Sequence, residues 1–63
     1  MIVNGKQVEY QAISLLEYLR RHGYREDCVV IERGGEIITK ERFGEIMLMP
    51  DDEINILQFM GGG

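Results

Sequence analysis

The sequence contains a single cysteine, Cys28, and therefore cannot form a disulfide bond within the chain. A small protein without covalent cross-links is typical of a reducing cytoplasm, which is the location we expect. The first ten residues lack a basic segment followed by a long apolar run, so we predict no signal peptide. No apolar run approaches the roughly 20 residues that span a bilayer, so we predict no membrane segment.

The sequence also contains fewer basic than acidic residues. Seven Lys and Arg stand against eleven Asp and Glu, which gives a net charge of −4. Binding to nucleic acid depends on a basic face that neutralises phosphates, so this charge argues against a nucleic-acid partner. It is compatible with docking on a basic surface of another protein.

The chain of 63 residues is short enough to be one domain, and its composition, 44% apolar and 29% charged, is that of a folded protein. A domain of this size buries only about 60% of its unfolded surface and has little material left for a substrate pocket. The sequence shows no acid–base pair, no nucleophile with a base and no phosphate-binding loop. His22 stands alone, without a second metal ligand at a suitable spacing. We therefore predict that the protein is not an enzyme and binds no metal.

The first third of the chain predicts a hairpin and one helix. Asn4-Gly5 lies between two short apolar-containing runs, which is a strong signal for a two-residue hairpin turn over residues 1–10. Ser14 and Glu17 have the spacing of a capping box, and Gly23 is suited to the position after a helix. These signals predict a helix over residues 14–22, with Leu15, Leu16 and Leu19 on its apolar face.

The rest of the chain predicts several short extended segments. Cys28–Ile31 is a β-branched run that indicates a buried strand, and we expect Cys28 to be a small buried residue. Further strands are expected at 36–38, 45–48 and 53–60, with one helical turn at 40–43 and turns at Gly34-Gly35 and Pro50-Asp51-Asp52. This order predicts an α+β fold of the β-grasp, or ubiquitin-like, kind, a mixed four- to five-stranded sheet packed on one helix. We expect this domain to span residues 1–60, followed by a flexible glycine tail, 61–63.

The most informative feature is the run Gly61-Gly62-Gly63, which directly follows the last predicted strand. Glycine has no Cβ, so such a tail can enter a channel that side chains would block, and three extended residues reach roughly 10 Å. A terminal carboxylate becomes an electrophile when it attacks the α-phosphate of ATP and forms an acyl-adenylate. The pattern therefore indicates that the reactive group is the carboxylate of Gly63 and that other enzymes act on it.

Along nearly its whole length, the sequence resembles the sulfur carrier (ThiS) family of thiamine biosynthesis. The resemblance is carried by Ile2–Lys6, Ile13–Leu19, Val29–Arg33, Glu36–Ile38, Lys40–Phe43 and Phe59–Gly63. Two departures are visible. Glu41-Arg42-Phe43 lacks the Pro-Arg pair that is frequent in the family, and the chain ends in three glycines rather than two. We take Gly63 as the reacting residue.

The resemblance implies a cycle in which partner enzymes do the catalysis. An adenylyltransferase (ThiF-like) would activate the Gly63 carboxylate with Mg-ATP, and a sulfur donor fed by a cysteine desulfurase would convert the adenylate to a thiocarboxylate. A thiazole synthase (ThiG-like) would then accept the sulfur. The carrier itself would hold no cofactor stably.

The last predicted strand alternates, which separates its side chains into two sets. If Ile54 and Ile56 face the helix, then Leu57 and Phe59 lie on the open face of the sheet. We predict that these two residues, with Met60, Gly61 and Gly62, contact the partner enzymes.

Other functions for such a chain remain open at this point. One is the small subunit of molybdopterin synthase, which also ends in a glycine pair that becomes a thiocarboxylate but is usually longer. Another is a ubiquitin-like interaction module whose tail is inert. A third is a modifier that is conjugated to lysines through Gly63.

Overall fold

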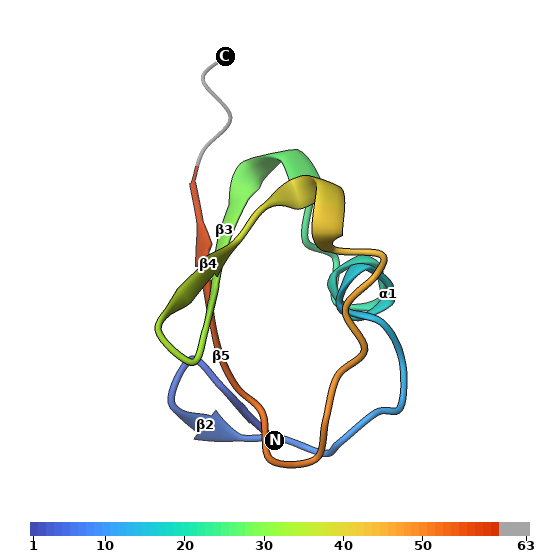
Figure 1. Ribbon diagram of the computed structural model, residues 1–63, viewed down its shortest axis with the longest axis vertical. Helices are drawn as coiled ribbons and strands as arrows, with labels where there is room; N and C mark the ends of the chain where they lie inside the picture. The colour runs from blue at the N-terminus through green and yellow to red at the C-terminus, as the bar shows by residue number, and fades with distance from the viewer. Residues whose placement is uncertain (60–63) are drawn as a thin grey trace.

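A computed structural model describes residues 1–59 of the chain. Its sheet has five strands in the order β2-β1-β5-β3-β4. The strand bounds are Ile2–Val3 (β1), Lys6–Gln7 (β2), Val29–Arg33 (β3), Glu36–Ile38 (β4) and Glu53–Gln58 (β5). β1 pairs with β5 in parallel and the other pairs are antiparallel, so the sheet is mixed, as predicted (Figure 1).

The N-terminal hairpin has the predicted turn. Asn4 and Gly5 have φ angles of 53° and 79°, and a two-residue turn of this kind needs positive φ at both positions. Its strands, β1 and β2, are shorter than the predicted span of residues 1–10, since each contains two residues. The second hairpin, β3–β4, turns in the same way at Gly34-Gly35, as the sequence indicated.

The helix α1 spans Leu15–Arg21 and is capped as predicted at its start. The side-chain oxygen of Ser14 accepts a hydrogen bond from the backbone N–H of Glu17 at 3.1 Å. The carboxylate of Glu17 pairs with Arg21 at 3.0 Å, one helical turn on, instead of returning to the cap. Gly23 follows the helix with a φ of 78°, which glycine adopts without strain.

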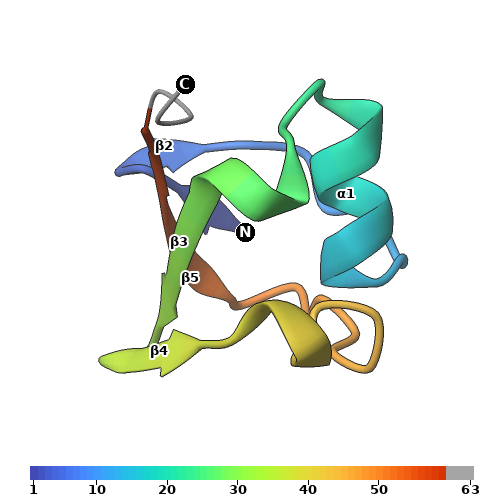
Figure 2. The same ribbon diagram turned by 90° about the horizontal axis from the view of Figure 1, so that it is seen from above.

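The core lies between α1 and one face of the sheet, and no helix formed by residues 1–59 covers the opposite face (Figure 2). Leu15 and Leu19 are fully buried, as predicted, whereas Leu16 is half-buried. Tyr18, which the prediction omitted, is buried instead. Positions 15, 18 and 19 follow the i, i+3, i+4 pattern of one helical face, and this places Leu16 on the flank of that face.

The prediction of a wholly buried strand over Cys28–Ile31 was wrong in part. Cys28 ends a short 3-10 helix, η1 (Glu26–Cys28), and β3 begins at the next residue. Ile31 is fully buried while Val30 is exposed. A sheet covered on one face buries only alternate residues of each strand, because successive side chains point to opposite faces. Cys28 itself is buried with a free thiol, as expected.

The prediction of a strand at residues 45–48 was also wrong. This segment lies beside the start of α1, where Met47 forms a single isolated bridge with Ser14. Leu48 donates a backbone hydrogen bond to Ile13 at 3.0 Å. Ile46 and Leu48 pack into the core, and the segment is hydrogen-bonded to Ile13 and Leu15 at the start of the helix and not to a strand of the sheet.

Two short predicted features between the strands were confirmed. The residues Lys40–Arg42 form a 3-10 turn, η2, which ends at Phe43. In the turn before β5, the backbone N–H of Asp52 donates to the carbonyl of Met49 at 3.1 Å, with Pro50 at the second position of the turn.

Candidate functional site

Strand β5 separates its side chains between the core and the open face of the sheet, as its alternation predicted. Ile54 and Ile56 are only 2% and 5% exposed, whereas Leu57 and Phe59 are 65% and 50% exposed. The placement of Leu57 and Phe59 on the open face is therefore confirmed. Their contact with partner enzymes stays a prediction.

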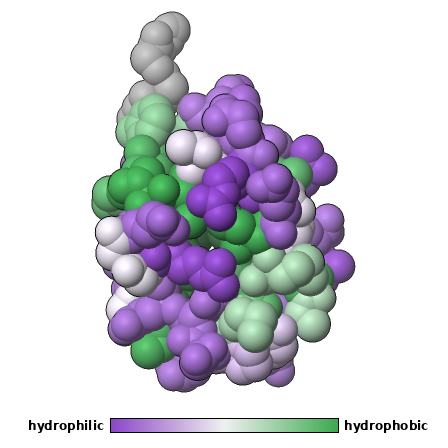
Figure 3. Space-filling model, viewed as in Figure 1, coloured by the Kyte–Doolittle hydropathy of each residue, from purple (hydrophilic) through white to green (hydrophobic). Residues whose placement is uncertain are grey.

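Two more apolar side chains lie on the same face. Val30 of β3 is directly opposite Leu57 in the ladder, and Ile37 of β4 is opposite Glu32. Val30, Ile37, Leu57 and Phe59 are all exposed, and we call these four residues the open-face patch. Figure 3 shows apolar surface along this side of the molecule, close to the end of β5. Val30 and Ile37 were not among the predicted site residues, although each stands next to a core residue in an alternating strand.

A carboxylate is built into this face. Glu32 lies between Asn55 and Ile37 in the ladder and is partly exposed. Its Oε1 accepts from the Asn55 side-chain amide and its Oε2 accepts from the Gly35 backbone N–H, both at 2.6 Å. The hydrogen bond from Asn55, and then that from Gly35, hold the pKa of Glu32 below its ordinary value, because both stabilise the ionised form.

The end of β5 is held on both of its edges. On one side, Phe59 donates its backbone N–H to the carbonyl of Cys28 at 3.0 Å. On the other side β1 has already ended, and the side-chain oxygen of Asn4 accepts from the backbone N–H of Ile56 at 2.7 Å. The body of the protein therefore fixes the chain as far as Phe59. Met60, Gly61, Gly62 and Gly63 were predicted as site residues and lie outside the described residues.

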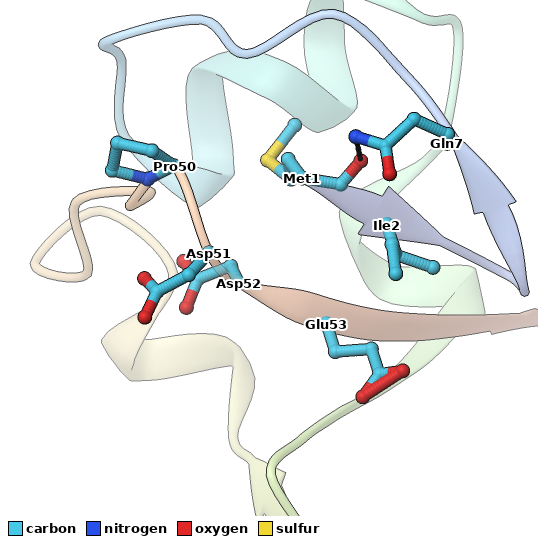
Figure 4. A pocket seen from close by; sticks show the side chains of 7 residues that line it. All are labelled: Met1, Ile2, Gln7, Pro50, Asp51, Asp52 and Glu53. Carbon is cyan, nitrogen blue, oxygen red and sulfur yellow. Dashed lines mark hydrogen bonds between the residues drawn. The ribbon is translucent and has the colours of Figure 1, made fainter.

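A shallow pocket of about 310 Å³ lies at the opposite end of β5 from Phe59 (Figure 4). It is lined by Met1, Ile2, Gln7, Pro50, Asp51, Asp52 and Glu53. The carboxylates of Asp51 and Glu53 point in different directions (Figure 4), and the carboxylate of Asp52 is already bound by Arg33 and the Met49 backbone N–H. The pocket is also at the other end of β5 from Leu57 and Phe59.

Other site types have little support in the part of the chain that the structure describes. Within residues 1–59, no three His, Cys, Asp or Glu side chains are grouped so that they could hold a metal ion. No helix in that range is both long and apolar enough to cross a membrane. The candidate site is therefore the open face of the sheet beside the end of β5, a surface that suits protein contact.

Comparison with known proteins agrees with this description. A model of the ThiS family matches residues 1–63. The sulfur carrier protein ThiS of Bacillus subtilis is 36% identical over 63 residues, which cover 97% of this chain and 96% of that protein. A thiazole synthase of Magnetococcus marinus is 31% identical over 62 residues, which cover 97% of this chain but 19% of that protein.

Solved structures show the same relationship. The crystal structure of the thiamine biosynthesis protein ThiS from Geobacter metallireducens superimposes with a TM-score of 0.75 at 29% sequence identity, covering 98% of this chain and 96% of that one. The predicted β-grasp fold is thereby confirmed. The family model spans the whole chain and the Bacillus protein matches it end to end, so this chain belongs to the ThiS family.

Proposed function

We propose that this protein is a sulfur carrier that donates sulfur for thiazole formation in thiamine biosynthesis. The observation that carries the proposal is its membership of the ThiS family, together with its full-length similarity to a protein named as a sulfur carrier. The exposed apolar surface beside the end of β5 supports it, because a carrier must be held by the enzymes that act on its end.

The reacting group in this proposal is the carboxylate of Gly63. One of its oxygens attacks the α-phosphate of ATP, pyrophosphate leaves, and an acyl-adenylate results. A sulfur nucleophile at the oxidation level of hydrosulfide then attacks the acyl carbon and displaces AMP. The product is a thiocarboxylate, which gives its sulfur to an acceptor and takes up one oxygen, from that acceptor or from water, so that the carboxylate is regenerated. Residues 61–63 act as the tail in this scheme and residues 1–60 as the body.

The catalytic groups belong to the partners and not to this chain. A ThiF-like adenylyltransferase would supply the Mg-ATP site. A cysteine desulfurase or another donor would supply sulfur, and where that sulfur arrives as a persulfide, a thiol reductant would supply the two electrons that bring it to the hydrosulfide level. The acceptor would be a ThiG-like thiazole synthase. The similarity to part of a thiazole synthase supports that pairing, because in Magnetococcus a segment like this chain occurs in the same polypeptide as that enzyme.

The body has one task in this mechanism, which is to deliver the tail in a fixed direction. β5 is hydrogen-bonded as far as Phe59. Ordering the three residues of the tail, 61–63, in a partner's channel costs on the order of 1–2 kcal/mol per residue. Contact of Leu57 and Phe59 with the partner would offset that cost, since a few anchor side chains that become buried carry most of the binding energy of a protein interface.

The experiment that tests the proposal is accurate mass spectrometry of the protein purified from its native host. Exchange of oxygen for sulfur has nearly the same nominal mass as one methionine oxidation, and the chain has four methionines. The modification must therefore be localised by alkylation and fragmentation to Gly63, away from Cys28. A variant that lacks Gly62 and Gly63 is the matched control.

A thiocarboxylate or adenylate at Gly63 that is missing from the truncated control would support the proposal. A plain carboxylate that persists after incubation with ATP, the adenylyltransferase and a sulfur source would contradict it. An unmodified protein whose partner binding survives the truncation would indicate an interaction module with an inert tail.

A further inference from the structure

The open face of the sheet carries an anion, Glu32, that forms no ion pair within residues 1–59. Glu32 lies beside Ile37 on β4 and Asn55 on β5, one ladder step past the buried Ile31. Its two hydrogen-bond donors, the Asn55 amide and the Gly35 backbone, are both neutral. Neutral donors orient a carboxylate but do not cancel its charge.

No cation of the described residues pairs with Glu32, and two of them, Lys40 and Arg42, belong to the η2 turn outside the sheet. Within residues 1–59, four ion pairs form, namely Arg20–Glu26, Arg21–Glu17, Arg25–Asp27 and Arg33–Asp52. None of these pairs includes Glu32. Lys6 is opposite the buried Val3 in the hairpin, so it stands on the other face of the sheet.

Glu32 is also held in one orientation before any partner arrives. Both of its oxygens accept a hydrogen bond at 2.6 Å, so little rotamer freedom remains to be lost on binding. An ionised carboxylate has about four acceptor positions, and two of them are still free. The same hydrogen bonds keep the group ionised, because they favour the charged form.

The setting of this anion is apolar. Val30 and Leu57 form the adjacent exposed pair of the ladder, about 7 Å along the strands at roughly 3.3 Å per residue, and Ile37 is its direct neighbour on β4. A partner that covers the open-face patch would therefore also remove water from around Glu32. A charge that loses its water needs a partner of opposite sign, or docking is penalised.

We propose that the adenylyltransferase covers the open-face patch and places a basic side chain, a guanidinium in particular, against Glu32. A guanidinium fits because its planar fork meets both carboxylate oxygens and it is less strongly hydrated than an ammonium group. The net charge of −4 suits a basic docking surface. This inference rests on the proposed function and adds the chemistry by which the activating enzyme recognises its carrier.

The test compares Glu32→Gln with Glu36→Gln. Both variants remove one negative charge, but Glu36 is next to Ile37 on the same strand and therefore faces the other way. Binding of each full-length variant to the host's adenylyltransferase is measured by calorimetry at low and high salt. We expect Glu32→Gln to bind about tenfold more weakly than the wild type at low salt. The difference in affinity should become smaller at about 0.5 M salt, because salt screens the charge of Glu32. Glu36→Gln should bind like the wild type.

Two further variants separate charge from local structure. Asn55→Ala removes a hydrogen bond to Glu32 and keeps the charge, so it should retain the salt dependence of the wild type. Glu32→Lys should bind more weakly than Glu32→Gln. Replacing one surface Arg of the enzyme by Glu should restore binding of Glu32→Lys. Such a rescue would show that Glu32→Lys is folded and that its weak binding comes from the reversed charge.

The results of this binding test can be told apart from those that bear on the proposed function. At saturating enzyme concentration, Glu32→Gln should still be adenylated at Gly63. If the wild type is adenylated and Glu32→Gln binds as tightly as Glu36→Gln at every salt concentration, the inference about Glu32 is wrong and the proposed function stands. A wild-type protein that is neither bound nor adenylated overturns both.

Discussion

The side chain of Asn4 replaces a missing strand partner at Ile56. The two-residue strand β1 ends at Val3, and Asn4 Oδ1 then accepts the hydrogen bond from the Ile56 backbone N–H at 2.7 Å. The backbone of Asn4 meanwhile occupies the positive-φ position of the hairpin turn, at 53°. One residue therefore both turns the first hairpin and holds the strand that leads towards the C-terminal glycines.

Asn4→Gly separates these two tasks, because glycine accepts positive φ but has no side-chain acceptor. We expect a loss of about 1–2 kcal/mol in the free energy of unfolding, since the Ile56 N–H loses its partner. Urea unfolding measures that loss, and the Ile56 amide should exchange with solvent faster. Asn4→Asp, which keeps an acceptor and tolerates this backbone, is the control. Unchanged exchange at Ile56 in Asn4→Gly would contradict the assigned role.

Arg33 and Asp52 join the end of β3 to the turn before β5. Arg33 Nε and Nη2 each donate to one oxygen of Asp52 at 3.0 Å, and the Met49 backbone N–H donates to the same carboxylate at 2.7 Å. The two side chains of the ion pair are only 28% and 11% exposed, so solvent screens this pair less than a surface one.

Asp52→Ala should therefore lower the free energy of unfolding by about 2 kcal/mol, because hydrogen bonds to a charged group are lost and Arg33 keeps an unpaired charge. The adjacent Asp51 is exposed and provides a control of the same type, for which we expect a change within about 0.5 kcal/mol. The two variants are compared by their midpoints of urea unfolding, analysed with a common m-value. Equal effects of the two substitutions would show that the Arg33–Asp52 pair adds no stability.

Leu57→Asp and Phe59→Asp test the docking role of the open-face patch. Both side chains are exposed, so each variant should remain folded. We expect the KM for adenylation to rise about tenfold or more with little change in kcat, because an anchor at an interface contributes more than about 1 kcal/mol. Met49→Asp is a matched control, since Met49 is as exposed as Phe59 but lies before β5. Normal adenylation of folded Leu57→Asp or Phe59→Asp would refute the docking role.

The ionisation of Glu32 predicts a specific pH dependence. Its pKa in the folded protein is lowered from an ordinary value of 4.5, chiefly by the Asn55 hydrogen bond. A lowered folded pKa adds stability that is fully present above 4.5 and is lost as the pH falls through the folded pKa. Asn55→Ala should therefore raise the pKa of Glu32 in an NMR titration. The free energy of unfolding of Asn55→Ala should also differ less from that of the wild type at acidic pH than at neutral pH. If the pKa of Glu32 is the same in Asn55→Ala and the wild type, the Asn55 hydrogen bond is not what lowers it.

The sequence determined the local turns and the helix, because these depend on residues that are close in the chain. Asn4-Gly5 and Gly34-Gly35 specify their hairpins through positive φ, and Ser14 specifies the start of α1 through its cap. The alternation of β5 was also sufficient to place Leu57 and Phe59 on the open face. Each of these predictions depended only on the alternation of side chains along a strand or on the chemistry of one or two residues.

The tertiary structure alone decided which segments meet. Residues 45–48 have a strand-like composition, yet they pair with the chain before α1, a choice that depends on the path of the loop and not on propensity. The contacts Asn4–Ile56 and Glu32–Asn55 join residues 52 and 23 positions apart, so no local pattern could reveal them. The sequence by itself predicted that other proteins act on this chain. The fold decided which side chains share the open face, because strand register placed an oriented carboxylate among exposed apolar side chains.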